Sequence, residues 1–461
     1  MYDVAVIGGG ISGCMAAIAA ARCGASVILI EKYGFLGGTL TACGTGPMMT
    51  FHAGDVQVVR GVTNELIERL MNKGFSPGHI FDTTGYTYTV TPFSAEGMKL
   101  ELEDMMAEAG VELLYHSVVC DVEYENAVIN SVEVYGKNGK RCIESRMFVD
   151  ASGDCDLAFL AGLETNKGRE ADGKCQPMTM NFKVINVDTD RVKEYIMNNN
   201  DEFPRLKSDL SKVTRAPKLS IGGYVNTLKK AQKTGKISFQ REDILFFETD
   251  RVGEFIVNTT RIINADPTEP KDLTRAEILG RKQAWEVLEL LKTEVQGFEN
   301  AELEFTGPFI GIRGSRQLKG SYVLTAEDII SCVDFDDTIA CGGYPIDIHA
   351  PEGNDTQMYE KTKLSLEYGD IYHIPYRSLI SDNVKNLITV GRCISANFEA
   401  QAAIRVSPIA GAIGHGGGVA AGICAVNNIN VQDIDIEELR KELKKQGMEE
   451  EMLEYADSYF K

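Results

Sequence analysis

The sequence predicts an α/β protein of two domains, with the second domain inserted into the first. The first 31 residues read as a strand, a glycine-rich turn, a helix and a second strand, which is how a doubly wound parallel sheet opens. At 461 residues, the chain is too long for one ordinary hydrophobic core. Strand-like segments at 146–150 and 384–391 return to the pattern of the opening unit, so we expect the first domain to be discontinuous.

The opening unit carries the spacing G-x-G-x-x-G. An apolar strand over residues 2–7 leads into Gly8, Gly10 and Gly13, and a helix over 14–23 follows. Gly8 permits a tight turn, Gly10 lets the backbone approach a pyrophosphate, and Gly13 lets the helix lie close to the strand. A pyrophosphate is expected at the N-terminus of this helix, where free N–H groups and the helix dipole favour an anion.

Glu31 ends the second strand, about twenty residues after the motif, where a dinucleotide site places an acid. Its carboxylate is expected to accept a hydrogen bond from a ribose 2′-hydroxyl. An acid at this position also disfavours a 2′-phosphate, so a ligand of the NADP type is not expected. The alternative is that the glycines form only a turn, although the strand–helix–strand context favours nucleotide binding.

Composition narrows the class of protein. The formal net charge is −20, so nucleic acid and anionic membranes are not expected as partners. No stretch reads as apolar enough to span a bilayer, and the first strand leaves no room for a signal peptide. The eleven cysteines form no C-x-x-C pair, so no metal site is expected. An odd cysteine count without a signal peptide fits a reducing compartment, and we expect a cytoplasmic location.

The elements of the first part follow in order. A Gly/Thr/Met-rich loop over 42–52 comes after the second strand, and an alternating strand at 86–91 is expected to lie away from the nucleotide domain. A helix over 94–108 starts at a capping region around Ser94. The other expected elements are a helix at 62–73, strands at 111–115, 116–121, 127–135 and 146–150, a turn at 136–139, and a helix at 155–162.

The second part changes character near residue 166. Residues 178–260 mix strands with charged helices and carry no nucleotide signature, and 274–295 reads as a long amphipathic helix. A strand at 384–391 and a Gly/Ala-rich helix at 409–426 then resume the first domain. Further extended segments are expected at 305–316, 339–348 and 369–374, and two short acidic helices parted by Gly447 at 434–460.

Three separated segments resemble the glutathione-reductase type of FAD-binding fold. These are the N-terminal unit, the turn Asp150-Ala151-Ser152-Gly153-Asp154, and the strand that ends in Gly391-Arg392 before a small-residue helix. The chain departs from the pattern at Gly391-Arg392, where many members have Gly-Asp. Together with several further motifs, these segments resemble the FAD-dependent oxidoreductase family of bacteria. Those motifs are Thr91-Pro92-Phe93, Gly311-Ile312-Arg313-Gly314-Ser315-Arg316, Tyr322-Val323-Leu324-Thr325, residues 374–379, Gly391-Arg392-Cys393-Ile394-Ser395 and residues 399–406.

The resemblance covers residues 2–426 and implies a flavoprotein. It implies a Rossmann-like FAD-binding domain of three layers (ββα) over 1–165 and 370–430, and an inserted α+β substrate domain over 166–369, to which 42–93 contributes. Residues 431–461 would form a helical tail. The FAD-binding residues it implies are Gly8, Gly10, Ser12, Gly13, Glu31, Lys32, Gly37, Gly38, Thr39, Val119, Ala151, Ser152, Gly153, Asp154, Gly391, Arg392 and Arg405.

The flavin would need stabilisation of the negative charge that develops on its ring when it takes a hydride. The stretch 407–414, with Pro408 in its first turn, is placed by order to be the helix start that does this. A tightly packed ordinary helix is the alternative. Arg313, Arg316 and Arg377 are candidate cations for a carboxylate or another anion. The candidate catalytic residues are His52, Arg313, Tyr376, Arg405 and His415.

The expected reaction is a two-electron hydride transfer between flavin N5 and a small organic substrate. Alternatives are a flavin-dependent monooxygenase or halogenase, an electron-transfer subunit without its own small substrate, and a binding protein that keeps FAD for structure. No second G-x-G-x-x-G occurs, so a separate NAD(P)H domain is not expected. The substrate, the reaction direction, the redox partner and the oligomeric state are left open.

Overall fold

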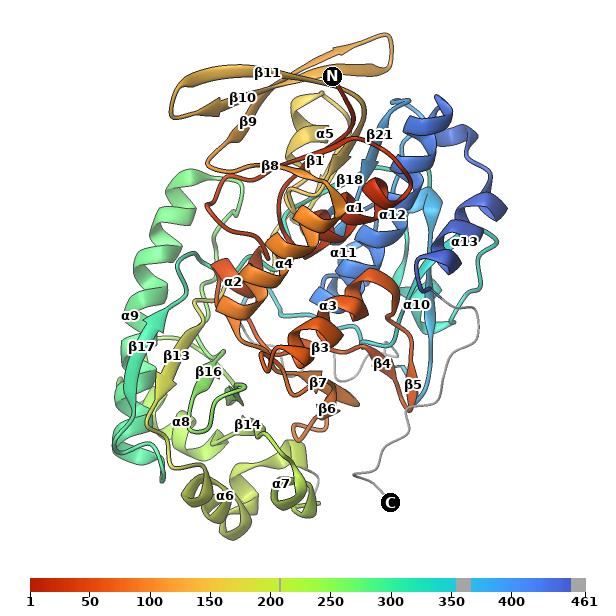
Figure 1. Ribbon diagram of the computed structural model, residues 1–461. Helices are drawn as coiled ribbons and strands as arrows, with labels where there is room; N and C mark the ends of the chain where they lie inside the picture. The colour runs from red at the N-terminus through yellow and green to blue at the C-terminus, as the bar shows by residue number, and fades with distance from the viewer. Residues whose placement is uncertain (207–208, 354–365, 449–461) are drawn as a thin grey trace.

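The main sheet of the molecule has the strand order β8-β2-β1-β11-β10-β9, with β21 also paired to β11. The computed structural model describes residues 1–206, 209–353 and 366–448 (Figure 1). The parallel strands are β1 (Tyr2–Ile7), β2 (Val27–Ile30), β8 (Glu112–Leu114) and β21 (Leu387–Thr389). The antiparallel strands are β9 (Val118–Glu125), β10 (Val128–Gly136) and β11 (Gly139–Asp150).

Strand β11 connects the parallel and antiparallel parts of this sheet. Its first half pairs with β10, whereas its last residues pair in parallel with β1 and β21, and Asp150 lies beside both Ile7 and Thr389. The turn after Asp150 therefore lies at the edge where β1 and β21 also end. Because ligands of open α/β sheets bind at the carboxyl ends of the strands, this edge is where a site is expected.

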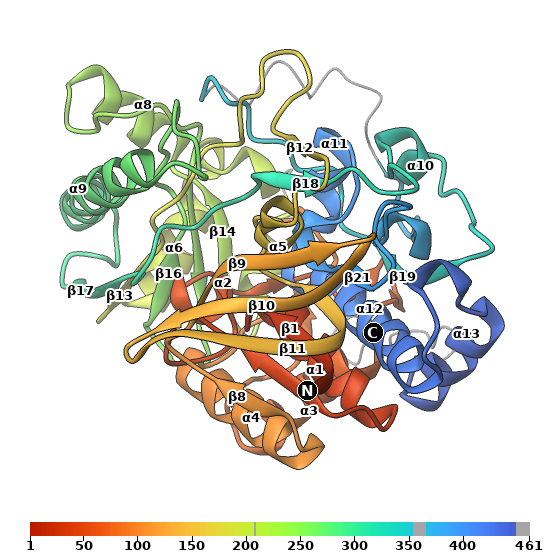
Figure 2. The same ribbon diagram turned by 90° about the horizontal axis from the view of Figure 1, so that it is seen from above.

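The two faces of the sheet are covered differently, and the result is a three-layer ββα domain. Val4 and Val6 of β1 pack in the core formed with α1 (Ile11–Arg22), α4 (Ala95–Ala109) and α12 (Ser407–Asn427). Ala5 and Ile7 pack instead with β10 and α5 (Asp156–Leu160). This alternation follows from the two-residue period of a strand. The predicted fold class is confirmed, and Figure 2 shows the antiparallel strands lying across the parallel core.

Helices α1 and α12 touch through their backbones. A Cβ added at Gly414 would lie 2.1 Å from the Ser12 carbonyl oxygen, and one at Gly418 would lie 2.3 Å from that of Ala16. Only glycine permits so close an approach.

Helix α12 is also long and apolar enough to cross a membrane, with a mean hydropathy of 1.5, so the prediction that no such stretch exists is wrong. Its apolar character is explained by packing, since it lies buried inside the molecule.

A second sheet has the antiparallel order β14-β15-β16-β13-β17. One face packs aromatic side chains such as Phe246 and Phe255 against α9 (Pro270–Glu294), and Phe298, from the segment after α9, joins the same cluster. Figure 1 shows α9 alongside β13 and β17. The strands are β13 (Phe182–Ile185), β14 (Ser220–Gly223), β15 (Ile244–Glu248), β16 (Phe255–Val257) and β17 (Glu302–Thr306), and the smaller helices are α6 (Thr189–Asn198), α7 (Ser211–Arg215) and α8 (Val225–Lys233).

Shorter elements join the two sheets. Three small sheets are formed by β3 (Met48–Met49), β7 (Thr89–Thr91) and β6 (Ile80–Phe81), by β4 (His52–Ala53) and β5 (Val56–Gln57), and by β19 (Thr338–Gly342) and β20 (Tyr372–Pro375). A further pair consists of β12 (Thr165–Lys167) and β18 (Arg316–Leu318). The other helices are α2 (Thr39–Ala42), α3 (Gly61–Asn72), α10 (Ala326–Ile330), α11 (Phe398–Ile404) and α13 (Ile436–Lys445), with single 3₁₀ turns η1 (Asn200–Glu202), η2 (Pro204–Leu206), η3 (Tyr376–Ser378), η4 (Gly391–Cys393) and η5 (Val431–Asp433).

Several element boundaries differ from the sequence-based expectation. The strand expected at 86–91 begins only at Thr89, because the buried Asp82 carboxylate accepts hydrogen bonds from the N–H groups of Thr84 and Thr87 and holds that stretch in a turn. Helix α9 begins four residues earlier than expected, at Pro270, a residue suited to a first helical turn. The acidic helix expected after Gly447 lies outside the described residues.

Candidate cofactor and substrate site

A cavity of about 390 Å³ lies between the two sheets. It is lined at one end by the turns that follow β1 and β2, and by the turn after β11. At the other end it is lined by Leu245 and Phe247 of β15, whose neighbours Ile244 and Phe246 point into the core of the second sheet. The cavity therefore joins the predicted nucleotide site to the inserted part of the chain.

The nucleotide end is shaped by glycines. Helix α1 starts after Gly10 and has no side-chain cap, and Gly10, Ile11 and Ser12 line the cavity. A Cβ added at Gly10 would have Gly38 Cα, at 3.9 Å, as its nearest neighbour, so it would project into open space within the cavity. A Cβ at Gly8, whose φ is +105°, would lie 2.5 Å from the Ala151 carbonyl oxygen. These features form the cradle that a pyrophosphate on a helix N-terminus requires.

Glu31 fixes the neighbouring turns. Its buried carboxylate accepts a hydrogen bond from the Gly9 N–H at 2.6 Å and another from the Tyr33 N–H at 2.8 Å. Glu31 also lines the cavity, together with Val119. A carboxylate has about four acceptor positions, so these two bonds leave capacity for a ribose hydroxyl.

The turn after β11 is organised by two carboxylates. Buried Asp150 accepts from the Ser152 hydroxyl at 2.6 Å and from the Ala158 N–H at 3.0 Å, and burial raises its pKa to about 6. Asp154 accepts from Arg392 at 2.8 Å and from the Ser315 hydroxyl. Burial opposes ionisation of Asp154, but Arg392 holds its pKa below the usual value.

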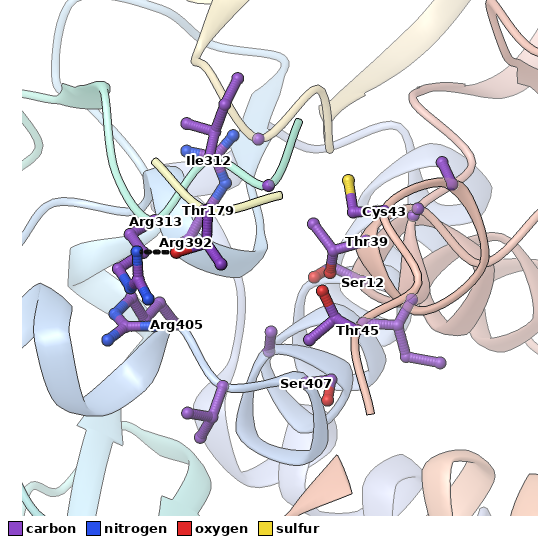
Figure 3. A pocket seen from close by; sticks show the side chains of 18 of the residues that line it. Ser12, Thr39, Cys43, Thr45, Thr179, Ile312, Arg313, Arg392, Arg405 and Ser407 are labelled. Atoms are coloured by element: carbon purple, nitrogen blue, oxygen red, sulfur yellow. Dashed lines mark hydrogen bonds between the residues drawn. The ribbon is translucent and has the colours of Figure 1, made fainter. Parts of the chain in front are cut away.

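The start of α12 reaches the same cavity. The helix begins at Ser407 with Pro408 in its first turn, it has no side-chain cap, and Val406, Ser407 and Ala410 line the cavity. Figure 3 shows Ser407 near Ser12, Thr39 and Thr45. The N-termini of two long helices, α1 and α12, therefore border one cavity, and both favour negative charge.

The far end of the cavity is cationic and aromatic. Asp347 is its central acceptor: it accepts from the Tyr344 hydroxyl at 3.2 Å and from Arg405 at 3.1 Å, and its carboxylate lies 3.3 Å from His349 Nε2. Burial works against ionisation, yet His349 and Arg405 hold the pKa of Asp347 well below its usual value. Arg313 donates to the Thr179 hydroxyl at 2.6 Å, the contact drawn in Figure 3.

Most of the predicted FAD-binding residues line the cavity. Gly13, Gly37 and Gly391 do not, but they pack directly behind it: a Cβ on Gly13 would overlap the Gly8 carbonyl oxygen, and one on Gly391 would overlap the Ser12 hydroxyl. The Gly37 N–H donates to the Gly9 carbonyl at 2.9 Å. The predicted residues that line it are Gly8, Gly10, Ser12, Glu31, Lys32, Gly38, Thr39, Val119, Ala151, Ser152, Gly153, Asp154, Arg392, Arg405 and Arg313.

Three candidate catalytic residues are not brought to the cavity. Tyr376 is buried and its hydroxyl donates to the Val431 carbonyl at 2.8 Å. His415 is buried in α12 against Gly61, and His52 is buried beside Thr89, with 2.9 Å between His52 Nδ1 and the Thr89 hydroxyl. Burial lowers the pKa of His415 to about 4 and that of His52 to about 3. Their positions give no support to a role at the flavin.

Two candidate anion-binding arginines are also engaged elsewhere. Arg316 donates to Asp156 and to the Asp154 carbonyl, and Arg377 pairs with Asp337 at 2.9 Å; neither lines the cavity. The cavity instead brings in residues that the sequence did not single out. They are Arg205, Arg241, Tyr86, Tyr344, Asp347 and His349, which come from loops and edges without a motif. Among the described residues, no group of three or more His, Cys, Asp or Glu could hold a metal ion.

Comparison with known proteins identifies the family to which the chain belongs. Residues 3–443 match the family described as FAD dependent oxidoreductase. The chain belongs to that family, and its cofactor is FAD. The glycine cradle at Gly10 and the unpartnered helix starts fit this group. So does one buried polar atom of a cavity-lining residue, Asn181 Oδ1, which has no hydrogen-bond partner among the described residues.

The individual relatives differ in chemistry. Digeranylgeranylglycerophospholipid reductase 2 of Methanothermobacter thermautotrophicus is 28% identical over 197 residues, 42% of this chain and 50% of that protein. The match thus spans about half the length of that archaeal relative. A geranylgeranyl bacteriochlorophyll reductase-like structure from Thermoplasma acidophilum has a TM-score of 0.49 at 14% identity, covering 96% of this chain and 83% of that one. A triple mutant of the flavin-dependent brominase Bmp2 has a TM-score of 0.48 at 15% identity, covering 96% and 84%.

Proposed function

We propose that the chain catalyses a two-electron oxidation or reduction of a small organic molecule, which binds in the far half of the cavity next to FAD. The support is the continuity of that cavity, which has Gly10 at one end and Arg313 and Tyr344 at the other. FAD supplies the hydride donor or acceptor when it is bound, and the protein supplies binding, orientation and charge.

The residues that would hold FAD follow from the site. Gly8, Gly10 and Gly38 leave room for the pyrophosphate, and Glu31 would accept from the ribose. The start of α12 at Ser407 would face the part of the cofactor that becomes negative, because a helix N-terminus stabilises an anion.

We assign to Tyr344 a hydrogen bond that orients the substrate. Burial, together with the Asp347 charge, raises the pKa values of Tyr344 and Tyr86 well above the ordinary value, so both phenols stay protonated at neutral pH. The Tyr344 hydroxyl donates to Asp347 at 3.2 Å, and the same protonated hydroxyl could donate to a substrate oxygen in the cavity instead. Tyr344→Phe is expected to lower kcat/KM by about tenfold, because the substrate loses one hydrogen bond.

The deciding experiment monitors the flavin absorbance of the holoenzyme under anaerobic conditions against a panel of small organic molecules. Bleaching by a molecule, or recovery of colour in photoreduced enzyme, supports the proposal. Reoxidation that requires O₂ and yields a hydroxylated or halogenated product would instead show a monooxygenase or halogenase. Electron exchange with protein partners alone would show an electron-transfer subunit.

A further inference from the structure

Four guanidinium groups line the far half of the cavity, and we call them the arginine wall: Arg205, Arg241, Arg313 and Arg405. They come from four separate places in the chain: the turn η2, the segment before β15, the loop between β17 and β18, and the end of α11. Figure 3 shows Arg313 and Arg405 next to one another, across the cavity from Thr39, Cys43 and Thr45. The wall therefore faces the cofactor end without being part of it.

Carboxylates pair with three members of the arginine wall. Asp243 lies 2.5 Å from Arg205 and 3.9 Å from Arg241, and Asp347 lies 3.1 Å from Arg405. Two of these arginines share one carboxylate, and Arg313 is not among the three. The whole chain has a formal net charge of −20, so this concentration of cations is local and opposite in sign to the rest of the protein.

Arg313 is the member of the arginine wall for which the described residues supply no carboxylate partner. It donates to the Pro177 carbonyl at 2.5 Å and to the Thr179 hydroxyl, and it forms no ion pair with any carboxylate of the described residues. Burial lowers its pKa to about 9, and repulsion from Arg405 and Arg241 adds to this effect. Neutral oxygen acceptors hold this side chain in place but do not neutralise it.

We propose that the arginine wall binds an oxyanion, a carboxylate or phosphate group of the substrate, with Arg313 and Arg405 as its main donors. This inference rests on the proposed function, because it names the substrate class of that same cavity. A guanidinium presents a planar fork of donors that matches the paired oxygens of either group. In a partly buried site the attraction is screened much less than at the surface. The anchored group would hold the rest of the molecule against the cofactor end.

The test uses the FAD-loaded enzyme and measures binding from the change in flavin absorbance and by calorimetry. The probes are succinate and acetate for carboxylates, methyl phosphate for phosphates, and succinamide as the uncharged match to succinate. The variants are Arg313→Gln and Arg405→Gln. Arg377→Gln is the matched control, because Arg377 pairs with Asp337 outside the cavity.

The expected result is that one anionic class binds and succinamide does not. Arg313→Gln and Arg405→Gln should each weaken that binding by about tenfold or more, whereas Arg377→Gln leaves it unchanged. The affinity for FAD should be the same in all of these proteins. Preference for succinate over methyl phosphate would identify a carboxylate substrate, and the reverse preference a phosphate.

Three outcomes would overturn the inference: no anion binds, succinamide binds as well as succinate, or the Arg313 variant loses FAD instead of the probe. The last would show that the arginine wall serves the cofactor. Failure of the proposed function is distinguishable. In that case the anions bind as described, but no molecule of either class exchanges electrons with the flavin.

Discussion

Arg392 Nη2 donates to Asp154 Oδ1 at 2.8 Å, and this ion pair joins the end of β21 to the turn after β11. Both side chains are about 15% exposed, so neither charge is well hydrated. The two segments lie 238 residues apart in the chain. Where many members of the resembling family have Gly-Asp, this chain has Gly391-Arg392. The acidic partner of Arg392 comes from the turn after β11, at Asp154.

Removing Arg392 should destabilise the fold, because the buried Asp154 carboxylate would lose its positively charged partner. Arg392→Gln is expected to lower the free energy of unfolding by about 3 kcal/mol, because the carboxylate keeps its charge but loses its cation. Urea unfolding of the apoprotein measures this. Addition of Asp154→Asn should recover a large part of the loss. An Arg392→Gln protein as stable as the parent would mean that the Arg392–Asp154 ion pair does not stabilise the fold.

Substitution of Gly10 should separate cofactor binding from folding. Gly10→Ala places a methyl group in the cavity with no protein atom nearer than 3.9 Å, so the apoprotein should unfold at an unchanged urea concentration. FAD affinity should fall by about tenfold or more because the methyl occupies the phosphate cradle. Gly136→Ala is the control, since its Cβ would make only ordinary contacts of 3.5 Å or more and Gly136 does not line the cavity. Equal FAD affinity in both variants would contradict this placement.

Buried His415 predicts a stability loss in acid. Its pKa is about 4 in the fold against 6.5 unfolded, so the unfolded chain takes up the proton first. The stability is therefore complete above about pH 6.5 and falls as the pH drops toward 4, by about 3 kcal/mol for this group. His415→Asn should reduce the pH dependence of urea unfolding over that range, whereas buried His52, whose pKa is about 3, keeps its own contribution.

The backbone contact between α1 and α12 should not tolerate a methyl group. Gly418→Ala would put Cβ 2.3 Å from the Ala16 carbonyl oxygen, so the helices must separate. We expect a loss of about 1–3 kcal/mol in unfolding free energy, despite the better helix propensity of alanine. Calorimetric melting of the apoprotein measures it, with Gly136→Ala again as reference. A gain in stability would show that the helices are free to move apart.

The FAD half of the molecule could be read from sequence because its signals are local. Gly8, Gly10 and Glu31 lie within one strand–helix–strand unit. The spacing of the two glycines indicates a tight turn and a close backbone approach, and the position of the acid indicates a ribose contact. The three-layer core was implied by the resemblance to the FAD-binding fold, which this unit and the later strand segments carry. The limits of β7 could not be predicted from the sequence. The buried Asp82 carboxylate holds the preceding residues in a turn, and the pattern of apolar residues gives no sign of that turn.

The far half of the cavity could not be read this way. Arg205, Arg241 and Asp347 are distributed over more than a hundred residues, and tertiary packing alone assembles them. Conversely, His52 and His415 have the chemistry of catalytic groups and neighbour the right motifs, yet the fold buries them. The residue type predicts what a side chain can do, whereas its position relative to a cavity depends on contacts between distant segments.

The pairing of α1 with α12 has a consequence for how the protein is made. The phosphate cradle is synthesised before α12 and β21, which complete its surroundings. A nascent chain that ends before Ser407 holds the glycine motif but lacks the helix packed on it. The complete cofactor site can therefore form only after α12 has been synthesised.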